Sequence, residues 1–477
     1  MSKLFFWAMN LLVFLLPTYL FRFKIAGLST NFFEICFLFI FIWWVIEKRY
    51  KKREGLKDNF MLTFRQFINQ NRLLSYGISL LLMGISLSTV FSPNQLTSLG
   101  IVKSWFIIPI ALVWMIINTF PENLKLKTQN SKFTFSRQDF ESSVKVPRRD
   151  VGGSSIASSS IPNFFYHPVS LLKSLAFSGL IVTFISLGYL FNNNLTYDGR
   201  LKAFFEHPNH LAMYLAPCLL IIVGHLLSRI ESQKNKIFWF VSLFIISIPL
   251  YFTYSYGAWM GIVIGGVTLL WGYRRIKTRP ESRKAISRKA LMILMVFIVI
   301  FAFVILTQAN SPKFQNIFIT QRSSLHSRLM IWRSASYILK NNWLLGIGPG
   351  MFQKHYLNYQ KYFSPYLEWA VPQPHNIFLA FWLQTGIIGF TGFILILIRF
   401  FRAGLKAIHK ISKNKKEALT ALILMAIMIY TLIHGLVDTL YWKNDLAVTF
   451  WVVIALMSII CHQDYLQRKE SPPCQKQ

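Results

Sequence analysis

The segment 371-VPQPHNIFLAFWLQTGIIGF-390 places an ionisable histidine and an asparagine at the mouth of a long apolar run. The prolines before this pair disfavour a helix upstream of it. The run that follows, residues 376–398, is long enough to cross a bilayer, which takes about 20 apolar residues. A charge inside a bilayer is costly. The role that His375 can have therefore depends on which side of a membrane it faces.

The composition of the chain indicates a membrane protein. Hydrophobic residues make up 54% of the 477 residues and charged residues only 14%, whereas a soluble domain carries about 25% charged residues. Apolar runs suited to crossing a bilayer recur along the chain, and there are about twelve of them. They lie near residues 4–20, 31–46, 73–91, 102–117, 169–190, 211–227, 237–253, 257–272, 290–307, 376–398, 418–437 and 446–461. The sequence therefore predicts an all-α polytopic membrane protein.

The net charge of +33 would suit a nucleic-acid-binding protein, but its distribution favours membrane topology. Alternate connections are rich in Lys and Arg, as in 48-KRYKK-52 and 273-YRRIKTRPESRK-284. The intervening connections hold few basic residues, apart from the long loop 308–375. Basic residues in short connections mark the cytoplasmic side. We therefore predict a multi-pass cell-membrane protein with both termini cytoplasmic, the 308–375 loop outside, membrane lipids as neighbours and no nucleic-acid partner.

Four parts are predicted along the chain. Residues 1–120 hold the first four spans, and residues 169–462 hold the others together with the external loop 308–375. Between them, residues 121–168 are basic and serine-rich without apolar periodicity, which predicts a disordered cytoplasmic linker. Residues 463–477 are predicted to be a cytoplasmic tail. The cysteines are scattered and no Cys/His cluster has metal-ligand spacing, so we predict no metal and no cofactor.

The outward segment 198-DGRLKAFFEHPNHLAMYLAP-217 crowds polar side chains at the start of a helix. Arg200 and Lys202 stand near this helix N-terminus, a natural place for an anion. The same segment also has an ordinary structural explanation, because Pro208 and Asn209 suit a turn and a helix cap. Both interpretations remain open at this point.

The segment 324-SLHSRLMIWRSASYILKNNWLLGIGPG-350 lies in the external loop. Its apolar residues recur at helical spacing, which predicts an amphipathic helix on the membrane surface. Arg328 would then reach lipid phosphates, and interfacial snorkelling is the plain alternative. Gly346, Gly348 and Gly350 allow positive φ and an anion-binding concavity of backbone N–H groups, although such residues also simply end helices.

His375 lies at the outer end of the tenth predicted span if the external loop faces out. A neutral imidazole there can accept a proton from an attacking hydroxyl, and an imidazolium can hold a phosphate. The neighbouring Asn376 is either part of the same site or a helix cap.

Near the end of the span 418–437, His434 and Asp438 have the i,i+4 spacing that would put them on one helix face. They are candidates for the acceptor side of a site, with an interhelical hydrogen bond at the membrane edge as the alternative. Tyr441 and Trp442 are typical of an interfacial aromatic belt.

The order of these motifs resembles a known family. The chain has HPN before a helix, then TYS-x-G-A-W, then SR-x3-W with GIGPG, then HN before a helix and G-x-x-G. This pattern is similar to the O-antigen ligase and polymerase superfamily, which includes Wzy-type polymerases, lipopolysaccharide ligases and bacterial O-oligosaccharyltransferases. The resemblance runs from about Gly199 to about Leu446, includes 434-HGLVDTLYWKNDLA-447, and fits the layout of about twelve spans with a large external loop.

The resemblance implies a metal-independent glycosyltransferase of cell-surface polysaccharide biosynthesis. Such enzymes move a glycan from a polyprenyl-diphosphate donor to a hydroxyl of a lipid, glycan or protein acceptor at the outer face of the membrane. The family's essential histidine would be His375 and its external-loop arginine Arg328. The leaving diphosphate needs fixed cations and N–H donors, a role we assign to Arg200 and Lys202 together with the glycines of GIGPG.

One position departs from the family pattern, because Tyr256 stands in 253-TYSYGAW-259 where the family usually has Arg. Another cation such as Arg200 or Lys202 then serves the diphosphate, or the substrate differs, or the site is impaired. The sequence does not separate ligase from polymerase.

The strongest rival is a transporter for a small bicarbonate-like anion, since relatives with similar HPN and GIGPG features have been proposed to move inorganic carbon. Ion-coupled transporters place ionisable pairs deep in the membrane, and the predicted spans contain few such groups. A membrane scaffold without catalytic function would not need the outer collection of Arg, His and Gly.

Overall fold

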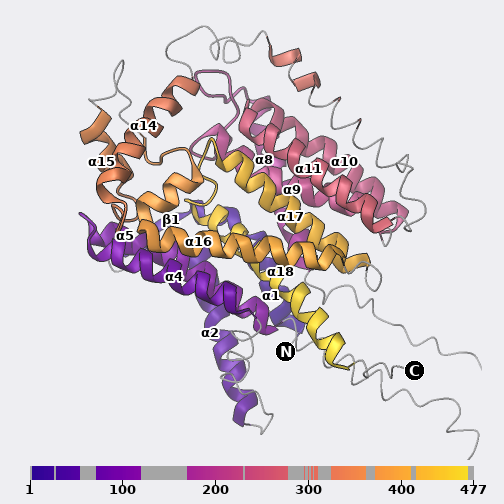
Figure 1. The fold of residues 1–477 in the computed structure, drawn as a ribbon. Coiled ribbons are helices and arrows are strands. Elements are labelled where there is room, and N and C mark those ends of the chain that lie inside the picture. The colour runs from indigo at the N-terminus through magenta and orange to yellow at the C-terminus, as the bar shows by residue number, and fades with distance from the viewer. Residues whose placement is uncertain are drawn as a thin grey trace, which may run out of the picture.

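The computed structural model describes residues 3–25, 28–53, 71–119, 169–228, 231–277, 295, 299, 302–304, 306–309, 324–360, 371–409 and 415–470. Within these ranges the chain is almost entirely helical, as Figure 1 shows. The strands among them are β1 (Arg22–Ile25) and β2 (Leu28–Asn31), which pair antiparallel with Arg22 opposite Asn31. The predicted all-α membrane fold is confirmed.

The helices fall into an N-terminal group and a later group. The N-terminal group is α1 (Lys3–Phe14), the short η1 (Leu16–Leu20), α2 (Phe32–Arg53), α4 (Arg72–Val90), α5 (Gln95–Val102) and the π-helical η2 (Lys103–Ile107). The later group is α8 (Val169–Phe191), α9 (Pro208–Leu227), α10 (Gln233–Phe252), α11 (Tyr256–Lys277), α14 (Ser324–Asn342), α15 (Phe352–Tyr359), α16 (Ile377–His409), α17 (Lys415–Gly435) and α18 (Asn444–Glu470).

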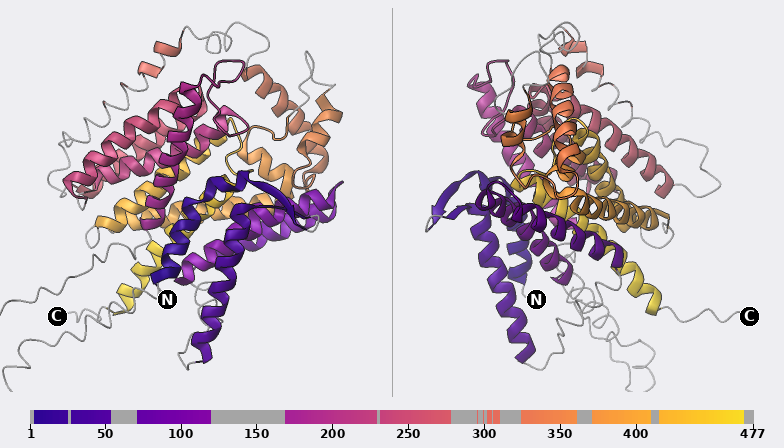
Figure 2. Two further views of the ribbon diagram at one scale, coloured as in Figure 1. Left: turned by 180° about the vertical axis from the view of Figure 1, so that it is seen from behind. Right: turned by 60° about the vertical axis from the view of Figure 1, so that its left-hand side comes forward.

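Nine helices of the described ranges are long and apolar enough to cross a membrane. Every predicted run coincides with a described helix except 290–307, most of which lies outside the described residues. The number of membrane-length helices is also lower than the predicted number of about twelve because of α1 and α2. The helix α1 is short. The helix α2 has Glu34 in its first turn and is charged again from Glu47 onward, which leaves a short apolar stretch. In Figure 2, α2 projects away from the other helices.

Two predicted parts of the chain lie wholly or partly outside the description. The predicted linker 121–168 lies outside the described residues. Of the predicted tail, residues 463–470 continue α18, and residues 471–477 lie outside the description.

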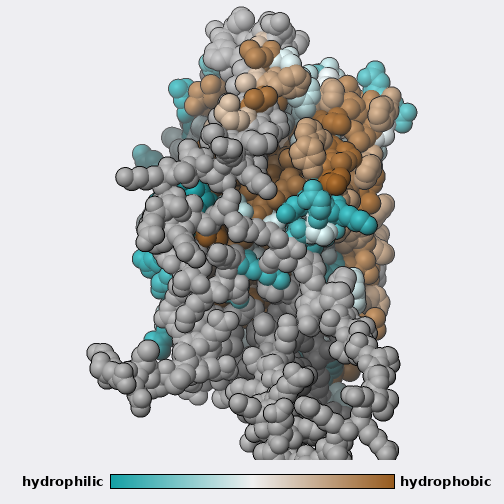
Figure 3. Space-filling view, turned by 90° about the vertical axis from the view of Figure 1, so that its right-hand side faces the viewer, coloured by the Kyte–Doolittle hydropathy of each residue, from teal (hydrophilic) through white to brown (hydrophobic). Residues whose placement is uncertain are grey.

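The helix α9 forms the centre of the bundle. Its membrane-length window is 94% buried, against 28% for α10. The difference follows from their surroundings, because an all-apolar helix is stable either inside a large protein or against lipid. Accordingly α10 exposes large side chains such as Phe240 and Phe244. Figure 3 shows the molecule from the side on which α10 lies in Figure 1. Hydrophobic side chains gather on this face.

The helices α4 and α16 run side by side through a glycine contact (Figure 1). A Cβ on Gly84 would collide with the backbone of Gly389, and one on Gly392 would collide with the backbone of Leu81. Small residues let membrane helices approach backbone to backbone. This contact fixes the long helix that begins just after His375.

We expect Gly84→Ala to destabilise the protein by about 1–3 kcal/mol, because the added methyl group overpacks this contact. Thermal unfolding of the purified protein in detergent measures the effect. The matched control is Gly188→Ala in α8, where the new Cβ meets nothing within 4 Å. The control should unfold at the wild-type temperature or above it, since Ala has the better helix propensity. Equal behaviour of the two variants would contradict the tight contact.

Candidate functional site

A cavity of about 600 Å³ lies where the ends of several helices meet. The start of α9, the helix α14, the entry to α16 and the turn between α17 and α18 all contribute to its lining. Among the lining residues are Arg200, Arg328, His375 and Asp438, all of which the sequence analysis singled out. The fold thus brings together side chains from four separate stretches of the chain.

A smaller cavity of about 250 Å³ shares Arg200, Asn209 and Arg328 with the larger one. Its other walls are mainly hydrophobic and include Met260 and Leu325. The two arginines therefore stand between a cavity with many polar side chains and one that is mostly apolar.

A row of hydrogen bonds runs across the larger cavity. Arg200 Nη2 donates to Asn209 Oδ1 at 2.6 Å, and Asn209 Nδ2 donates to Asp438 Oδ2 at 2.9 Å. The other oxygen of Asp438 lies 3.1 Å from His375 Nδ1 and also accepts from the Thr439 backbone N–H. We call Arg200, Asn209, Asp438 and His375 the polar row. It connects a guanidinium to an imidazole through one buried carboxylate.

The polar row fixes the tautomer of His375. Burial by itself would raise the pKa of Asp438, but the positive charges of His375 and Arg328 outweigh it and hold this pKa well below its usual range. An ionised carboxylate only accepts hydrogen bonds, so His375 Nδ1 must donate to it. In the neutral imidazole the lone pair is then on Nε2. A third of the His375 side chain is exposed (33%).

The backbone at His375 is strained. Its φ is +48°, in the left-handed region that residues other than glycine rarely adopt. Such a conformation costs about 1–3 kcal/mol and persists only where the surroundings enforce it. Here the Trp332 indole donates to the His375 carbonyl at 3.3 Å, and Asp438 holds the ring. The strain identifies His375 as a residue whose side-chain direction is imposed.

Each arginine is fixed by a backbone carbonyl. Arg200 Nε donates to Thr253 O at 2.8 Å, and Arg328 Nε donates to Val437 O at 2.7 Å. Burial lowers the pKa of Arg200, and the charge of Arg328 lowers it further. Tyr256 lines the smaller cavity together with both arginines. Arg200 thus lies beside the position where the family pattern has its own Arg.

The glycines of GIGPG do not face either cavity. Gly346, Gly348 and Gly350 have the positive φ that the sequence indicated, 75°, 90° and 79°. However, their N–H groups donate to Asn342 O, Ser88 Oγ and Gln384 Oε1. These donors are used to dock the loop on α4 and α16, so the expected anion-binding concavity is absent from this described loop. Lys202 lines neither cavity either.

Asn376 is a helix cap in the structure. Its Oδ1 accepts from the N–H groups of Phe378 and Leu379, both at 3.0 Å, and its amide donates to Leu436 O. It does not line either cavity. Of the two interpretations, the cap is the one that the geometry supports.

The predicted helix face of His434 and Asp438 was wrong. The helix α17 ends at Gly435, so Asp438 lies in the turn beyond it and faces His375 instead. His434 is buried and lines the smaller cavity. Its Nδ1 lies 2.9 Å from the Tyr430 hydroxyl oxygen.

The predicted aromatic belt was wrong as well. Tyr441 and Trp442 are 0% and 2% exposed. The Tyr441 hydroxyl donates to Trp105 O at 2.7 Å, so these rings pack inside the protein against η2. Two adjacent aromatic residues near a helix end are typical of a membrane interface. The sequence does not show that η2 covers these two rings.

Sequence reasoning left Asn209 open between a helix cap and a functional residue, and it did not predict the central place of Asn209 in the polar row. Its side chain is not the cap, because α9 already starts at Pro208 with His207 at the cap position. Reasoning from the sequence also missed Trp105, Lys443 and Asn444, which line the larger cavity. Within the described ranges, no group of three or more His, Cys, Asp and Glu side chains could hold a metal ion.

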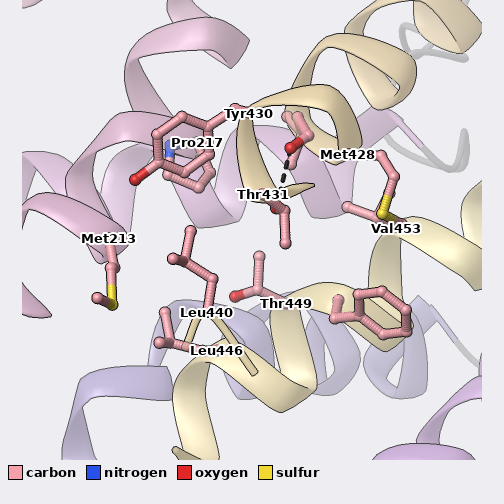
Figure 4. A pocket seen from close by; sticks show the side chains of 11 residues that line it. Met213, Pro217, Met428, Tyr430, Thr431, Leu440, Leu446, Thr449 and Val453 are labelled. Atoms are coloured by element: carbon pink, nitrogen blue, oxygen red, sulfur yellow. Dashed lines mark hydrogen bonds between the residues drawn. The ribbon is translucent and has the colours of Figure 1, made fainter. Parts of the chain in front are cut away.

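A third pocket, shown in Figure 4, has a volume of only about 10 Å³. Its walls are largely apolar, and the Thr431 hydroxyl that faces it already donates to Ile427 O within its own helix. A space of this size holds about one water molecule. It is a packing gap beneath the α17–α18 turn.

We expect Asp438→Asn to lower the free energy of unfolding by about 3 kcal/mol at neutral pH, since it removes the buried charge that pairs with His375 and compensates the nearby arginines. Because the folded-state pKa of Asp438 is lowered, its stabilisation is complete above about pH 4, the ordinary pKa of Asp. It is lost as the pH falls below that value. Thermal unfolding in detergent at pH 8, 5 and 3.5 measures this.

The matched control is Asp198→Asn, whose carboxylate is partly exposed and 3.8 Å from Arg200. Such a pair contributes at most about 1 kcal/mol. A wild-type-like melting temperature for Asp438→Asn at pH 8 would contradict the importance of the polar row.

Residues 241–394 match the protein-family model described as O-Antigen ligase. The match contains Arg328 and His375, while Arg200, Asn209 and Asp438 lie outside it. A comparison with curated proteins finds no match. The family match confirms the resemblance to the O-antigen ligase and Wzy-type superfamily that the motifs predicted.

Proposed function

We propose that this O-antigen ligase-type membrane protein transfers a glycan from a polyprenyl-diphosphate carrier to an acceptor hydroxyl on the outer face of the membrane. The observation that carries the proposal is the polar row in the larger cavity, with Arg328 beside it. It combines a base whose tautomer is fixed with two guanidiniums suited to a diphosphate.

In the proposed reaction, His375 Nε2 takes the proton from the acceptor hydroxyl. The hydroxyl oxygen forms a bond to the anomeric carbon of the donor glycan, and the bond from that carbon to the diphosphate oxygen breaks. Asp438 stabilises the imidazolium that forms, as a carboxylate does for a catalytic histidine. The departing diphosphate keeps the electron pair, and its charge is stabilised by Arg328 and Arg200.

The cations supply the positive charge that makes a metal-independent mechanism reasonable. Two guanidiniums held by backbone carbonyls raise each other's energy while the site is empty. A diphosphate relieves this repulsion and accepts bidentate hydrogen bonds from them. The smaller cavity, with Met260 and Leu325 in its wall, suits the first isoprene units of the carrier.

The outer-face assignment rests on the distribution of basic residues, with both termini cytoplasmic. Of the site residues, Arg200, His375 and Asp438 lie in connections between helices. The proposed partners are a lipid-linked glycan donor, an acceptor hydroxyl and membrane lipids.

We expect His375→Ala to lower glycan transfer by about 10²- to 10⁴-fold, the usual loss when a general base is removed. Arg328→Lys keeps the charge but loses the planar fork, and it should lower transfer at least about tenfold. The assay uses the protein in proteoliposomes with an extracted pool of polyprenyl-diphosphate glycans, and it measures both released polyprenyl diphosphate and extended glycan.

The matched control is His326→Ala, a histidine of the same helix as Arg328 that lines neither cavity. It should retain wild-type transfer. A wild type that consumes no donor from any pool, or a His375→Ala variant with full transfer, would sink the proposed function, and flux of a small anion would be measured next.

A second prediction concerns the position where the family pattern has Arg. If Arg200 serves the diphosphate in place of that residue, Arg200→Ala loses transfer by about 10²-fold or more, as for other transition-state donors. The double variant Arg200→Ala, Tyr256→Arg should recover part of this loss, because Tyr256 lines the smaller cavity next to Arg200. No recovery in a well-folded double variant would show that Arg200 acts elsewhere.

A further inference from the structure

The larger cavity has a wall that the smaller cavity does not share. Arg200, Asn209 and Arg328 line both cavities, but Trp105, Glu206, Lys443 and Asn444 line only the larger one. The proposed function places the diphosphate at the shared arginines. We call Trp105, Glu206, Lys443 and Asn444 the far wall, and His375 lies elsewhere in the lining of the larger cavity.

The far wall is a built surface rather than a collection of mobile side chains. Trp105 lies in the π-helical η2, and its indole Nε1 donates to Asn444 Oδ1 at 2.6 Å. Its ring meets the Trp442 ring edge to face at 5.9 Å. A π-helical turn within an α-helix is often found at a functional site. Here it turns a half-buried indole into the cavity wall and holds it there.

The charged groups of the far wall are paired with one another. Lys443 Nζ donates to Glu206 Oε2, and Arg22 Nη2 lies 3.7 Å from Glu206 Oε1. Burial acts to raise the pKa of Glu206, but the hydrogen bond and charge of Lys443 outweigh it and hold this pKa below its usual range. The carboxylate is therefore ionised at neutral pH. It takes up the charge of one of its two cations, and its oxygens can also accept hydrogen bonds from hydroxyl groups of a ligand.

A fixed indole beside a carboxylate, an ammonium and a side-chain amide is suited to a sugar ring. The carboxylate accepts hydrogen bonds from hydroxyl groups, the ammonium and amide donate to them, and charged partners make such bonds strong. The indole face packs against the apolar C–H face of the ring. A lipid acceptor would instead place acyl chains against these charged groups and exclude water from them, which is costly.

The larger cavity has the volume of an ordinary ligand site. Its volume of about 600 Å³ lies within the range of about 300–1,000 Å³ that accommodates a drug-sized ligand. Asp438 and Lys443 belong to the same turn between α17 and α18, so the far wall and the base His375 are tied to one rigid segment. A hydroxyl of a sugar held on the far wall is thereby presented to His375 Nε2.

We propose that Trp105, Glu206, Lys443 and Asn444 form the acceptor subsite, and that the acceptor is the terminal sugar of a glycan. This inference rests on the proposed function and narrows its acceptor from lipid, glycan or protein to a saccharide. In the transfer step a hydroxyl of that sugar loses its proton to His375 and forms the new glycosidic bond, while the polyprenyl diphosphate leaves.

The test compares acceptors and variants in proteoliposomes with the extracted polyprenyl-diphosphate glycans as donor. The acceptor probes are an oligosaccharide cleaved from the surface glycan of the same cells and a Ser/Thr-rich peptide. We expect the wild type to use the oligosaccharide. Lys443→Met should raise the KM for the oligosaccharide by about 10-fold or more, the value of one hydrogen bond to a charged group. Trp105→Phe should raise it by a similar factor, because it reduces the ring face and removes the hydrogen bond that holds Asn444. The KM for the donor should change far less.

The matched controls are Lys340→Met and Trp343→Phe, an exposed lysine and an exposed tryptophan that line neither cavity. They should leave both KM values at wild type. Melting temperatures show whether each variant is folded. Transfer to the peptide in place of the oligosaccharide, or equal changes in the donor and acceptor KM, would overturn the subsite.

A direct binding measurement separates this inference from the proposed function. Calorimetric titration of the oligosaccharide into the detergent-solubilised wild type and into Trp105→Phe does not need turnover. If the wild type binds the oligosaccharide and Trp105→Phe binds it about 10-fold more weakly, the subsite stands even where no transfer is seen. If the wild type transfers glycan but the two proteins bind the oligosaccharide equally, the subsite fails and the proposed function survives.

Discussion

The contact between the buried carboxylate of Asp438 and the His375 imidazole is the constraint on which the site depends. A carboxylate that is buried away from water needs several hydrogen-bond donors. Otherwise the free-energy cost of its desolvation exceeds the gain from its ion pair. Asp438 receives donors from His375, Asn209 and the Thr439 backbone. These belong to the entry to α16, the start of α9 and the α17–α18 turn. One charge therefore ties together three segments far apart in the sequence, and it does so at the place where the chemistry is proposed.

The fold class was predictable because a bilayer imposes a simple rule on a sequence. Apolar runs of membrane length become helices, since no other backbone arrangement satisfies its hydrogen bonds in lipid except a closed barrel. The runs at 73–91 and 169–190 became α4 and α8 within a residue or so of the predicted bounds. The positive φ of Gly346, Gly348 and Gly350 was predictable for an equally local reason. Each of these features follows from the residues of a single segment.

The partners of the site residues were not predictable, because they depend on where helices end. Had α17 continued past Gly435, Asp438 would have shared a face with His434, as the i,i+4 spacing suggested. The helix stops instead, where Gly435 packs closely on Ile377. The same turn buries Trp442, which alone would suit a membrane surface. The GIGPG amides were misjudged similarly, since Ser88 and Gln384 accept from two of them across long sequence separations.

The polar row also bears on the missing family Arg at Tyr256. Charge at a diphosphate site can be supplied from any backbone segment that reaches the same space, provided that it is held. Arg200 reaches the wall of the smaller cavity from a connection before α9, and Thr253 and Asn209 hold its guanidinium. The polar row also connects Arg200 through Asn209 to Asp438, and Asp438 contacts His375. An anion that pulls on Arg200 therefore acts on the carboxylate that orients His375. In this arrangement, the proposed donor site at Arg200 and the orientation of His375 are coupled through Asn209.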